Sequence, residues 1–184
     1  MNTAATLSLA GWSPARFTAD EFATMIGAGL FADRRVELVQ GELREMPPAG
    51  NRHARRHAAI AYRLIAALGE AMVRVEVAIR LDHETIAAPD AAVLRRDVVE
   101  DGPIAAADVL MVVEVADTSL SYDVGVKRTI YATAGIAHYW VVDARRSVVH
   151  VYGTAVADDY ETLVVIAFGE PLTVPGTDAV VTID

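Results

Sequence analysis

Four charged residues lie within or beside apolar segments of this 184-residue chain. Glu37 lies in the segment Val-Glu-Leu-Val, Asp90 directly follows a proline, and Glu114 interrupts an apolar run. Lys127 follows 13 residues after Glu114. A carboxylate buried in a strand is unfavourable by several kcal/mol unless it is paired with a cation or binds a metal. These four residues are therefore the first candidates for a chemically active site.

The types of these residues favour one kind of chemistry. The chain has no cysteine and five histidines, so a metal site must use carboxylates, carbonyls or imidazoles. Converging carboxylates form an oxygen-ligand site that suits Mg²⁺ or Mn²⁺. A lysine beside such a site can stabilise a developing oxyanion or orient a water. Acids, a divalent metal and a lysine together are the equipment for hydrolysing a phosphodiester.

Each of the four residues also has a purely structural interpretation. Asp90 could cap a turn, and Glu114 could pair with a buried arginine. Lys127 could be a solvated helix residue, and Glu37 could be an exposed member of a hairpin. The four residues taken together indicate a site more strongly than any one of them alone.

Hydrophobic patterning predicts the strands that carry the three acids. Residues 36–39 and 42–46 alternate in polarity and predict a β-hairpin with Glu37 in its first strand. Residues 89–94 predict a second strand, which begins at the Pro-Asp pair. The apolar run 109–115 predicts a central strand that is buried on both faces.

The rest of the pattern predicts helices between the strands. A capping box at Thr18 predicts a short helix to about residue 26, and a helix over 123–134, ended by Gly135, carries the lysine. The remaining expected elements are a helix over 51–72, a half-buried strand over 73–81, loops over 95–103 and 117–122, a hairpin of 138–143 with 147–152, and short strands within 161–183. This order predicts an α/β fold with a central mixed β-sheet flanked by helices and extra C-terminal strands. We expect a single domain over residues 1–184, with a flexible lead-in over residues 1–15.

Several longer segments match a known family pattern. They are Val36-Glu37-Leu38-Val39-Gln40-Gly41-Glu42-Leu43, Pro89-Asp90-Ala91-Ala92-Val93-Leu94, Val112-Val113-Glu114-Val115-Ala116-Asp117-Thr118-Ser119, and the stretch from Tyr122 to Asp143. On these segments the chain resembles the Uma-two family, a large group of proposed nucleases within the PD-(D/E)XK superfamily. The resemblance covers about residues 16 to 168 and implies a restriction-endonuclease-like core.

The resemblance also implies roles for individual residues. Asp90 and Glu114 would ligate the metal, with the backbone carbonyl of Val115 as an additional ligand. Glu37 would be an accessory acid, and Lys127 would be the catalytic lysine.

The chain departs from the superfamily pattern at two places. The lysine of that pattern lies two residues after the second acid, where this chain has Ala116. The resemblance therefore implies that the lysine has moved to the following helix. Relatives carry a Gln-Asn/Gly-Pro stretch where this chain has Glu76-Val77-Ala78, which puts details of the ligand set in question.

A dense basic patch lies at the start of the predicted helix over 51–72. Arg52, His53, Arg55 and Arg56 lie there, and this patch could contact a DNA backbone or form a solvated helix face. His53 and His57 are four residues apart, a spacing that can bind a metal, but no third ligand is evident nearby in the sequence. A polar or phosphate-contacting helix start is the favoured interpretation. By contrast, Tyr131, Tyr139 and Trp140 are expected to be core aromatics.

The overall charge limits the kind of partner. With 16 Lys and Arg against 25 Asp and Glu, the formal net charge is −9, which argues against a protein that coats nucleic acid through a basic face. We expect no membrane span and a cytoplasmic location, because no long apolar run or secretory signal is evident.

The residues and the resemblance together favour a Mg²⁺- or Mn²⁺-dependent endonuclease acting on DNA, and we expect it to be a homodimer. Two alternatives stay open. One is an inactive nuclease-fold module that binds nucleic acid or protein, and the other is a hydrolase of a small phosphorylated molecule.

Overall fold

The computed structural model describes residues 13–99 and 101–184. Its centre is a six-stranded mixed sheet in the order β11-β10-β9-β8-β6-β3. Its strands are β3 (Val73–Val75), β6 (Ala91–Leu94), β8 (Val109–Ala116), β9 (His138–Asp143), β10 (Val148–Val156) and β11 (Asp159–Ala167). β8 and β9 pair in parallel, and the other pairs are antiparallel. The prediction of a mixed sheet flanked by helices is confirmed.

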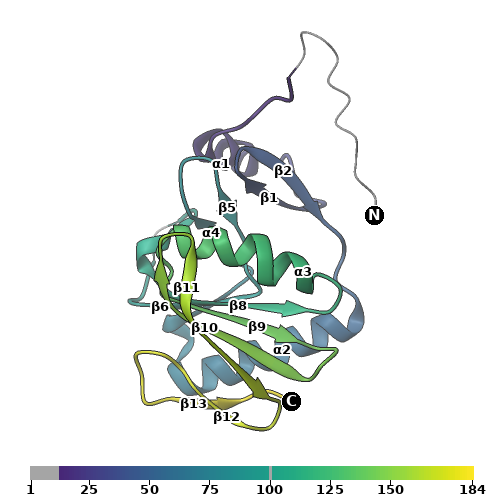
Figure 1. Ribbon diagram of the computed structural model, residues 1–184. Helices are drawn as coiled ribbons and strands as arrows, with labels where there is room; N and C mark the ends of the chain where they lie inside the picture. The colour runs from purple at the N-terminus through teal and green to yellow at the C-terminus, as the bar shows by residue number, and fades with distance from the viewer. Residues whose placement is uncertain (1–12, 100) are drawn as a thin grey trace.

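Helices cover both faces of this sheet (Figure 1). Helix α2 (Asn51–Leu68) packs against β3 and β8 on one face. On the other face, α4 (Arg128–Thr133) packs against β10 and β11. Leu64 of α2 and Tyr131 of α4 belong to two separate apolar clusters, one on each side of the sheet. The sheet is therefore buried on both faces, which explains the near-continuous apolar sequence of β8.

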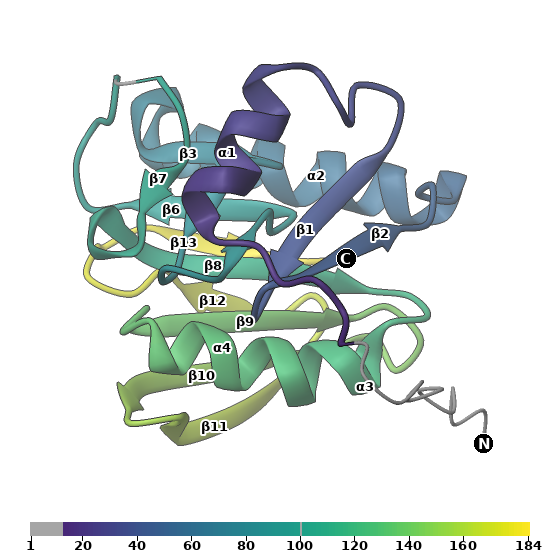
Figure 2. The same ribbon diagram turned by 90° about the horizontal axis from the view of Figure 1, so that it is seen from above.

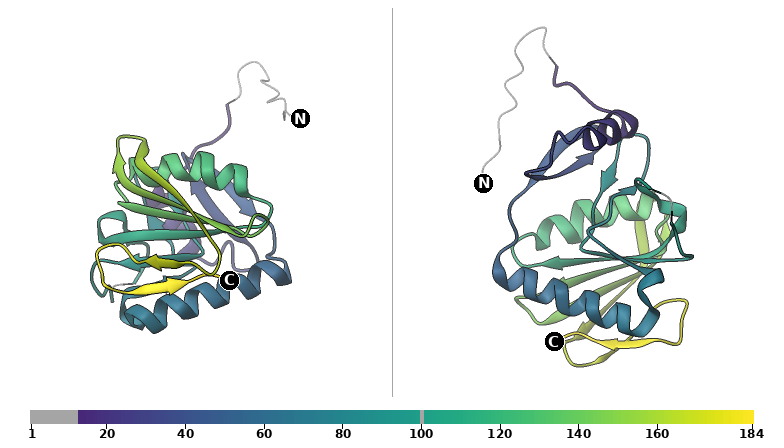
Figure 3. Two further views of the ribbon diagram at one scale, coloured as in Figure 1. Left: turned by 60° about the horizontal axis from the view of Figure 1, so that its bottom comes forward. Right: turned by 180° about the vertical axis from the view of Figure 1, so that it is seen from behind.

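A smaller sheet lies above the α4 side (Figures 2 and 3). Its order is β2-β1-β5-β4-β7. The strands are β1 (Arg35–Val39), β2 (Glu42–Met46), β4 (Ile79–Arg80), β5 (Ile86–Ala87) and β7 (Ile104–Ala105). Helix α1 (Ala19–Gly27) packs on it through Phe22, beside Leu38 and Ile86. The predicted capping box is present, because Thr18 accepts from the Glu21 N–H and the Glu21 carboxylate accepts from the Thr18 N–H.

The predicted hairpin of 36–39 and 42–46 is confirmed. Its two turn residues, Gln40 and Gly41, both have positive φ, 52° and 77°. Positive φ at both central positions is the type I′ geometry, whose twist matches that of the flanking strands. The turn therefore fixes the register that places Glu37 opposite Arg44.

The prediction of one strand over 73–81 is wrong. The chain leaves the large sheet after β3 and enters the small sheet at β4, and Glu76 at the break has φ of 51°. Alternating polarity reports burial of every second side chain, and it does not report a change of sheet. The chain crosses between the same two sheets again from β5 to β6, and Asp90 lies at that crossing.

The predicted helix over 123–134 is present in two consecutive pieces, and a further short turn precedes them. A short turn α3 (Leu120–Tyr122) comes first, then a π-helical turn η3 (Asp123–Lys127), then α4. Gly135 follows with φ of 74°, as expected for a helix end. Because α3 lies in the predicted loop over 117–122, that loop is shorter than expected.

Two further boundaries differ from the expected ones. The helix predicted over 51–72 ends at Leu68, because Gly69 has φ of 85° and a 3₁₀ turn η1 (Glu70–Met72) follows. Residues 159–167 form the long strand β11, which pairs with β10.

The remaining elements are short. The small sheet of β12 (Pro171–Thr173) and β13 (Val180–Thr182) lies beside α2 (Figure 3), and a 3₁₀ turn η2 (Ala106–Asp108) precedes β8. Most of the predicted lead-in, residues 1–12, lies outside the described residues. Within the described ranges, none of the helices is long and apolar enough to cross a membrane.

Candidate active site

Glu114 reaches the site because of the two-residue period of β8. Residues 113 and 115 belong to the apolar cluster on the α2 face, and residues 112 and 116 belong to the cluster on the α4 face. Successive side chains of a strand point to opposite faces, so Glu114 points toward the α3–α4 segment. Its side chain is only 7% exposed.

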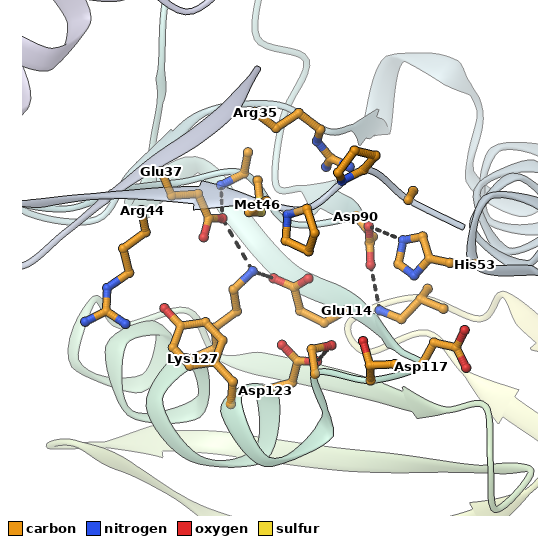
Figure 4. A pocket seen from close by; sticks show the side chains of 18 of the residues that line it. Arg35, Glu37, Arg44, Met46, His53, Asp90, Glu114, Asp117, Asp123 and Lys127 are labelled. Atoms are coloured by element: carbon orange, nitrogen blue, oxygen red, sulfur yellow. Dashed lines mark hydrogen bonds and ion pairs between the residues drawn. The ribbon is translucent and has the colours of Figure 1, made fainter. Parts of the chain in front are cut away.

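The α3–α4 segment supplies two donors to this carboxylate, Lys127 and Tyr131, of which Lys127 is labelled in Figure 4. Lys127 Nζ lies 2.8 Å from Glu114 Oε1, and the Tyr131 hydroxyl donates to the same oxygen at 2.7 Å. Lys127 and Tyr131 are one helical turn apart, so both point toward β8. Lys127 also lies 3.4 Å from Glu37 Oε1. The lysine is thus buried between two acids, and the interpretation of Lys127 as a solvated helix residue is wrong.

Glu37 comes from the small sheet and lies above the same lysine (Figure 4). Its Oε1 accepts from the Ala88 N–H at 2.9 Å as well as from Lys127. Ala88 lies two residues before Asp90, in the crossing from β5 to β6. Glu37 is 2% exposed, so the interpretation as an exposed hairpin residue is wrong.

Asp90 is held at the start of β6 by one donor on each oxygen. Oδ2 accepts from the Val115 N–H at 2.7 Å, and Oδ1 lies 3.2 Å from His53 Nε2. The contact with Val115 is made by its amide, and the predicted role of the Val115 carbonyl as a metal ligand stays a prediction.

The four predicted residues line one pocket of about 620 Å³ between the two sheets. Arg35, Arg44, His53 and Asp123 line it as well. The structure therefore brings together Glu37, Asp90, Glu114 and Lys127, which are far apart in the sequence. Their catalytic roles stay predictions.

Burial and neighbouring charges shift the pKa values of these groups in different directions. Burial raises the pKa of Asp90, but hydrogen bonds from His53 and the Val115 N–H outweigh it and leave that pKa below its usual value. Burial raises the pKa of Glu114 to about 8, although the Lys127 ammonium acts in the opposite sense. Burial would lower the pKa of Lys127, but Glu114 and Glu37 outweigh it and raise that pKa. Asp90 is thus ionised at neutral pH, and Lys127 keeps its proton between Glu114 and Glu37.

The predicted nucleic-acid patch is divided between two environments. His53 lines the pocket, whereas Arg52 and Arg55 are exposed to solvent at the start of α2. The guanidinium of Arg56 lies 5.4 Å from the ring centre of Phe168. Contact of this patch with DNA stays a prediction.

Sequence reasoning missed some residues of the site. Tyr131 is fully buried as a core aromatic should be, but its hydroxyl also contacts Glu114. Asp123 is 3% exposed and accepts from the Ser119 hydroxyl at 2.6 Å. Asp123 and Lys127 are four residues apart on a predicted helix, so they share one face of it. This spacing could have indicated that Asp123 lies near the site. The two pocket arginines, Arg35 and Arg44, have no sequence signal beyond their position on the hairpin.

The mixed sheet flanked by helices is a nuclease-like fold, and comparison with known proteins identifies its family. The profile of the Uma2 family, described as "Putative restriction endonuclease", matches residues 19–183. The chain belongs to this family, as its resemblance indicated. Among solved structures, a "putative nuclease belonging to DUF820" from Anabaena variabilis is similar with a TM-score of 0.63 and 19% identity, over 88% of this chain and 89% of that one. None of the curated proteins matches the chain.

Proposed function

We propose that the protein is a metal-dependent endonuclease that hydrolyses phosphodiester bonds of DNA. The observation that carries the proposal is the convergence of Glu37, Asp90, Glu114 and Lys127 in one pocket. Membership of a family described as restriction endonucleases supports the same class of reaction.

The donor set of the pocket fits a hard divalent cation. Both hydrogen bonds to Glu114 go to Oε1, so its other oxygen is left for a ligand within the described part of the chain. Asp90 supplies a permanent negative charge beside it. Carboxylate oxygens select Mg²⁺ or Mn²⁺, and Asp90, Glu114 and the Val115 carbonyl would hold this ion. When bound, such an ion activates a water and stabilises negative charge on a phosphate.

The protein's own residues would prepare the phosphate for attack. Lys127 carries its positive charge at the floor of the pocket, where it is placed to stabilise negative charge on a bound phosphate. Glu37 orients Lys127 and contributes a further carboxylate. Arg35 and Arg44 line the pocket and offer contacts to the sugar-phosphate backbone.

The proposed DNA contacts are few. Arg52, His53, Arg55 and Arg56 lie at the start of α2, beside the pocket, and would contact phosphates next to the cleaved bond. Because the net charge is −9, binding should be weak and sensitive to salt. The proposal includes a homodimer, because cleavage of two strands suits two-fold symmetry. Its expected location, the cytoplasm, stays a prediction.

Plasmid cleavage with Mg²⁺ or Mn²⁺ tests the proposal. Asp90→Asn, Glu114→Gln and Lys127→Met should each lower the cleavage rate by at least about 100-fold, because each removes a charge or a carboxylate ligand from the site. Asp158→Asn, which changes an exposed acid on the turn after β10, serves as the matched control and should cleave at the parent rate. Undiminished cleavage by the Asp90 variant would refute the assigned metal site.

A second candidate function is hydrolysis of a small phosphorylated molecule. A partly enclosed pocket of about 620 Å³ is within the size range of small-ligand sites, and the acidic surface is poorly suited to long DNA contacts. Release of p-nitrophenol from the phosphodiester bis-p-nitrophenyl phosphate, without cleavage of plasmid or single-stranded DNA, would favour this function. Absence of both activities would favour a binding module without catalysis.

A further inference from the structure

The two histidines of α2 find their third partner in Asp90. His53 and His57 lie one helical turn apart on the same face of α2, and the sequence shows no ligand near them. In the fold, one ring nitrogen of each histidine and one carboxylate oxygen of Asp90 lie within 4.8 Å of one another. Asp90 comes from the crossing between the two sheets, 33 residues after His57.

The distance between His53 and Asp90 fits a shared ion. His53 Nε2 and Asp90 Oδ1 are 3.2 Å apart. Two ligand atoms that each lie about 2.1 Å from one ion, at roughly a right angle, are separated by about 3 Å. The side chains are largely buried, with exposures of 19% for His53, 11% for His57 and 8% for Asp90. The ligand atoms are therefore already shielded from bulk water.

His57 is oriented as a metal-binding imidazole usually is. Its Nε2 lies 2.6 Å from the backbone oxygen of Asp90. A carbonyl oxygen only accepts, so this contact requires the proton on Nε2, and in the neutral ring of that tautomer Nδ1 is the nitrogen that can bind an ion. Metal-binding histidines commonly donate their other ring N–H to a carbonyl in this way. On the Nδ1 side, Glu76 Oε1 lies 3.8 Å away and is held at 3.2 Å by Arg35.

We infer that His53, His57 and Asp90 form a second divalent-metal site, selective for transition metals such as Co²⁺ or Zn²⁺. Imidazole nitrogen suits these ions, whereas Mg²⁺ prefers oxygen ligands. The inference deepens the proposed function, because Asp90 belongs to both sites. Its Oδ1 faces His53, and its Oδ2 faces the Val115 amide beside Glu114.

Because Asp90 is shared, the pocket has two metal sites that prefer different ions. One is the all-oxygen site of Asp90 and Glu114, and the other is the mixed nitrogen and oxygen site of the two histidines. If His53 and Asp90 formed only an ion pair, His57 would contribute nothing to metal binding. The two histidines are therefore tested separately.

Isothermal titration of the full chain with Co²⁺, in the presence of saturating Mg²⁺, tests the inference without any measurement of cleavage. The parent should bind one Co²⁺ per chain under these conditions. His53→Gln and His57→Gln should each weaken Co²⁺ binding at least tenfold and leave Mg²⁺ affinity unchanged. A glutamine amide can still donate near the position of Nε2, so both variants keep the hydrogen bonds to Asp90.

His83→Gln is the matched control, because His83 is an exposed histidine that also lies near a carboxylate, at 3.8 Å from Glu84. It should bind Co²⁺ like the parent. Circular dichroism of each variant establishes that it is folded, and the rise in Tm on addition of Co²⁺ gives a second measure of binding.

The outcomes separate this inference from the proposed function. Parent-like Co²⁺ affinity in His57→Gln, or an equal loss in His83→Gln, would overturn the inference even if the protein cleaves DNA. Loss of Co²⁺ binding in both α2 variants, with binding retained in Glu114→Gln, would support it even if no nucleic acid is cleaved.

Discussion

At the scale of single residues, one oxygen of Glu114 receives both of its hydrogen bonds. Lys127 Nζ and the Tyr131 hydroxyl both donate to Oε1, at 2.8 and 2.7 Å. Lys127 supplies charge, whereas Tyr131 is a neutral donor whose pKa is raised well above its usual value, chiefly by burial and then by the Glu114 charge. Tyr131 therefore fixes the rotamer of Glu114 and keeps its second oxygen available for a ligand.

Removal of this hydroxyl should weaken metal binding more than it weakens the fold. We expect Tyr131→Phe to raise the Mg²⁺ concentration needed for half-maximal activity about tenfold, which corresponds to about 1.4 kcal/mol, the contribution of one hydrogen bond to a charged group. Titration of activity with Mg²⁺ measures this shift.

Tyr139→Phe provides the matched control for that experiment. Tyr139 is equally buried and its ring centre lies 5.2 Å from that of Tyr131, but its hydroxyl donates to the backbone oxygen of Asp123. Tyr139→Phe should lower the free energy of unfolding about as much as Tyr131→Phe does. It should leave the Mg²⁺ dependence of activity closer to that of the parent. An equal shift of the Mg²⁺ dependence in both variants would mean that Tyr131 acts only through the stability of the core.

Asp143, at the end of β9, should give the fold part of its pH dependence. Burial raises the pKa of this carboxyl, but hydrogen bonds from the Arg146 side chain and from the backbone N–H groups of Arg146 and Arg145 outweigh it and lower that pKa. Because the pKa is lower in the folded state than in the unfolded chain, Asp143 stabilises the fold above the unfolded value of about 3.9. This contribution is lost as the pH falls through the lowered folded pKa.

Comparison of the parent with Asp143→Asn isolates this contribution. At pH 6 the free energy of unfolding of the variant should be lower by about 1–2 kcal/mol, because Arg146 loses its negatively charged partner. The loss stays this small because the side-chain amide oxygen of the variant can still accept from the backbone N–H groups. Below about pH 3 the difference should shrink as the parent becomes protonated. Urea unfolding at both pH values measures the difference, and a constant gap across this range would contradict the assignment.

At the scale of elements, the β1–β2 turn positions Glu37 above Lys127. Gln40 takes a left-handed conformation that asparagine adopts more easily, and its side chain is exposed. Gln40→Asn should therefore raise the free energy of unfolding by about 0.5–1 kcal/mol and leave cleavage unchanged. Chemical denaturation and a cleavage assay test both parts.

Gly41→Ala is the opposing substitution in the same turn. A Cβ at this position would meet Arg16 Cβ at 3.1 Å, and φ is 77°. We expect a loss of about 1–2 kcal/mol from the left-handed backbone alone, together with lower activity as the hairpin shifts. A neutral effect of Gly41→Ala on unfolding would show that the turn is not a constraint on the hairpin.

Elements with a local signature could be predicted from the sequence, and changes between sheets could not. The capping box at Thr18, the turn at Gln40-Gly41 and the helix end at Gly135 each depend on neighbouring residues, and all three are confirmed. The break at Glu76 depends on the position of a second sheet, which no local pattern encodes. The short strands β4, β5 and β7, two residues each, are too short to show a period.

The candidate site was predictable where a charge interrupts an apolar pattern. Glu114 and Glu37 stand out because their neighbours are apolar, and Asp90 and Lys127 gained their roles from the family resemblance. Tyr131 gave no such signal, because a buried tyrosine needs no special explanation in a sequence, and His57 was marked by its spacing from His53 but without a partner. Their contacts with Glu114 and Asp90 join residues 17 and 33 positions apart, and only the fold reveals them.

At the scale of the whole molecule, β11 forms an unprotected edge of the large sheet. It is the last strand in the sheet order, and its outer side has no partner in residues 13–99 and 101–184. Leu163, Val164 and Val165 are 52%, 55% and 53% exposed. Successive side chains of a strand point to opposite faces, so β11 is uncovered on both faces over this stretch. Between Tyr160 and Phe168 the only charged residue is Glu161, whereas exposed sheet edges usually carry charges or prolines that block pairing.

An edge of this kind suits a second copy of the same chain, because two β11 strands related by a two-fold axis pair antiparallel and bury the same residues twice. We therefore place the proposed homodimer at this edge.

Val164→Lys should shift the protein to a monomer in light scattering coupled to size-exclusion chromatography, because pairing would bring two lysines together. Val180→Lys, with the same 55% exposure on β13, is the control and should leave the dimer intact. A parent protein that stays monomeric at about 100 μM, far above the dissociation constant of a specific complex, would exclude the dimer. Dissociation by Val180→Lys in place of Val164→Lys would move the interface to the β12–β13 side.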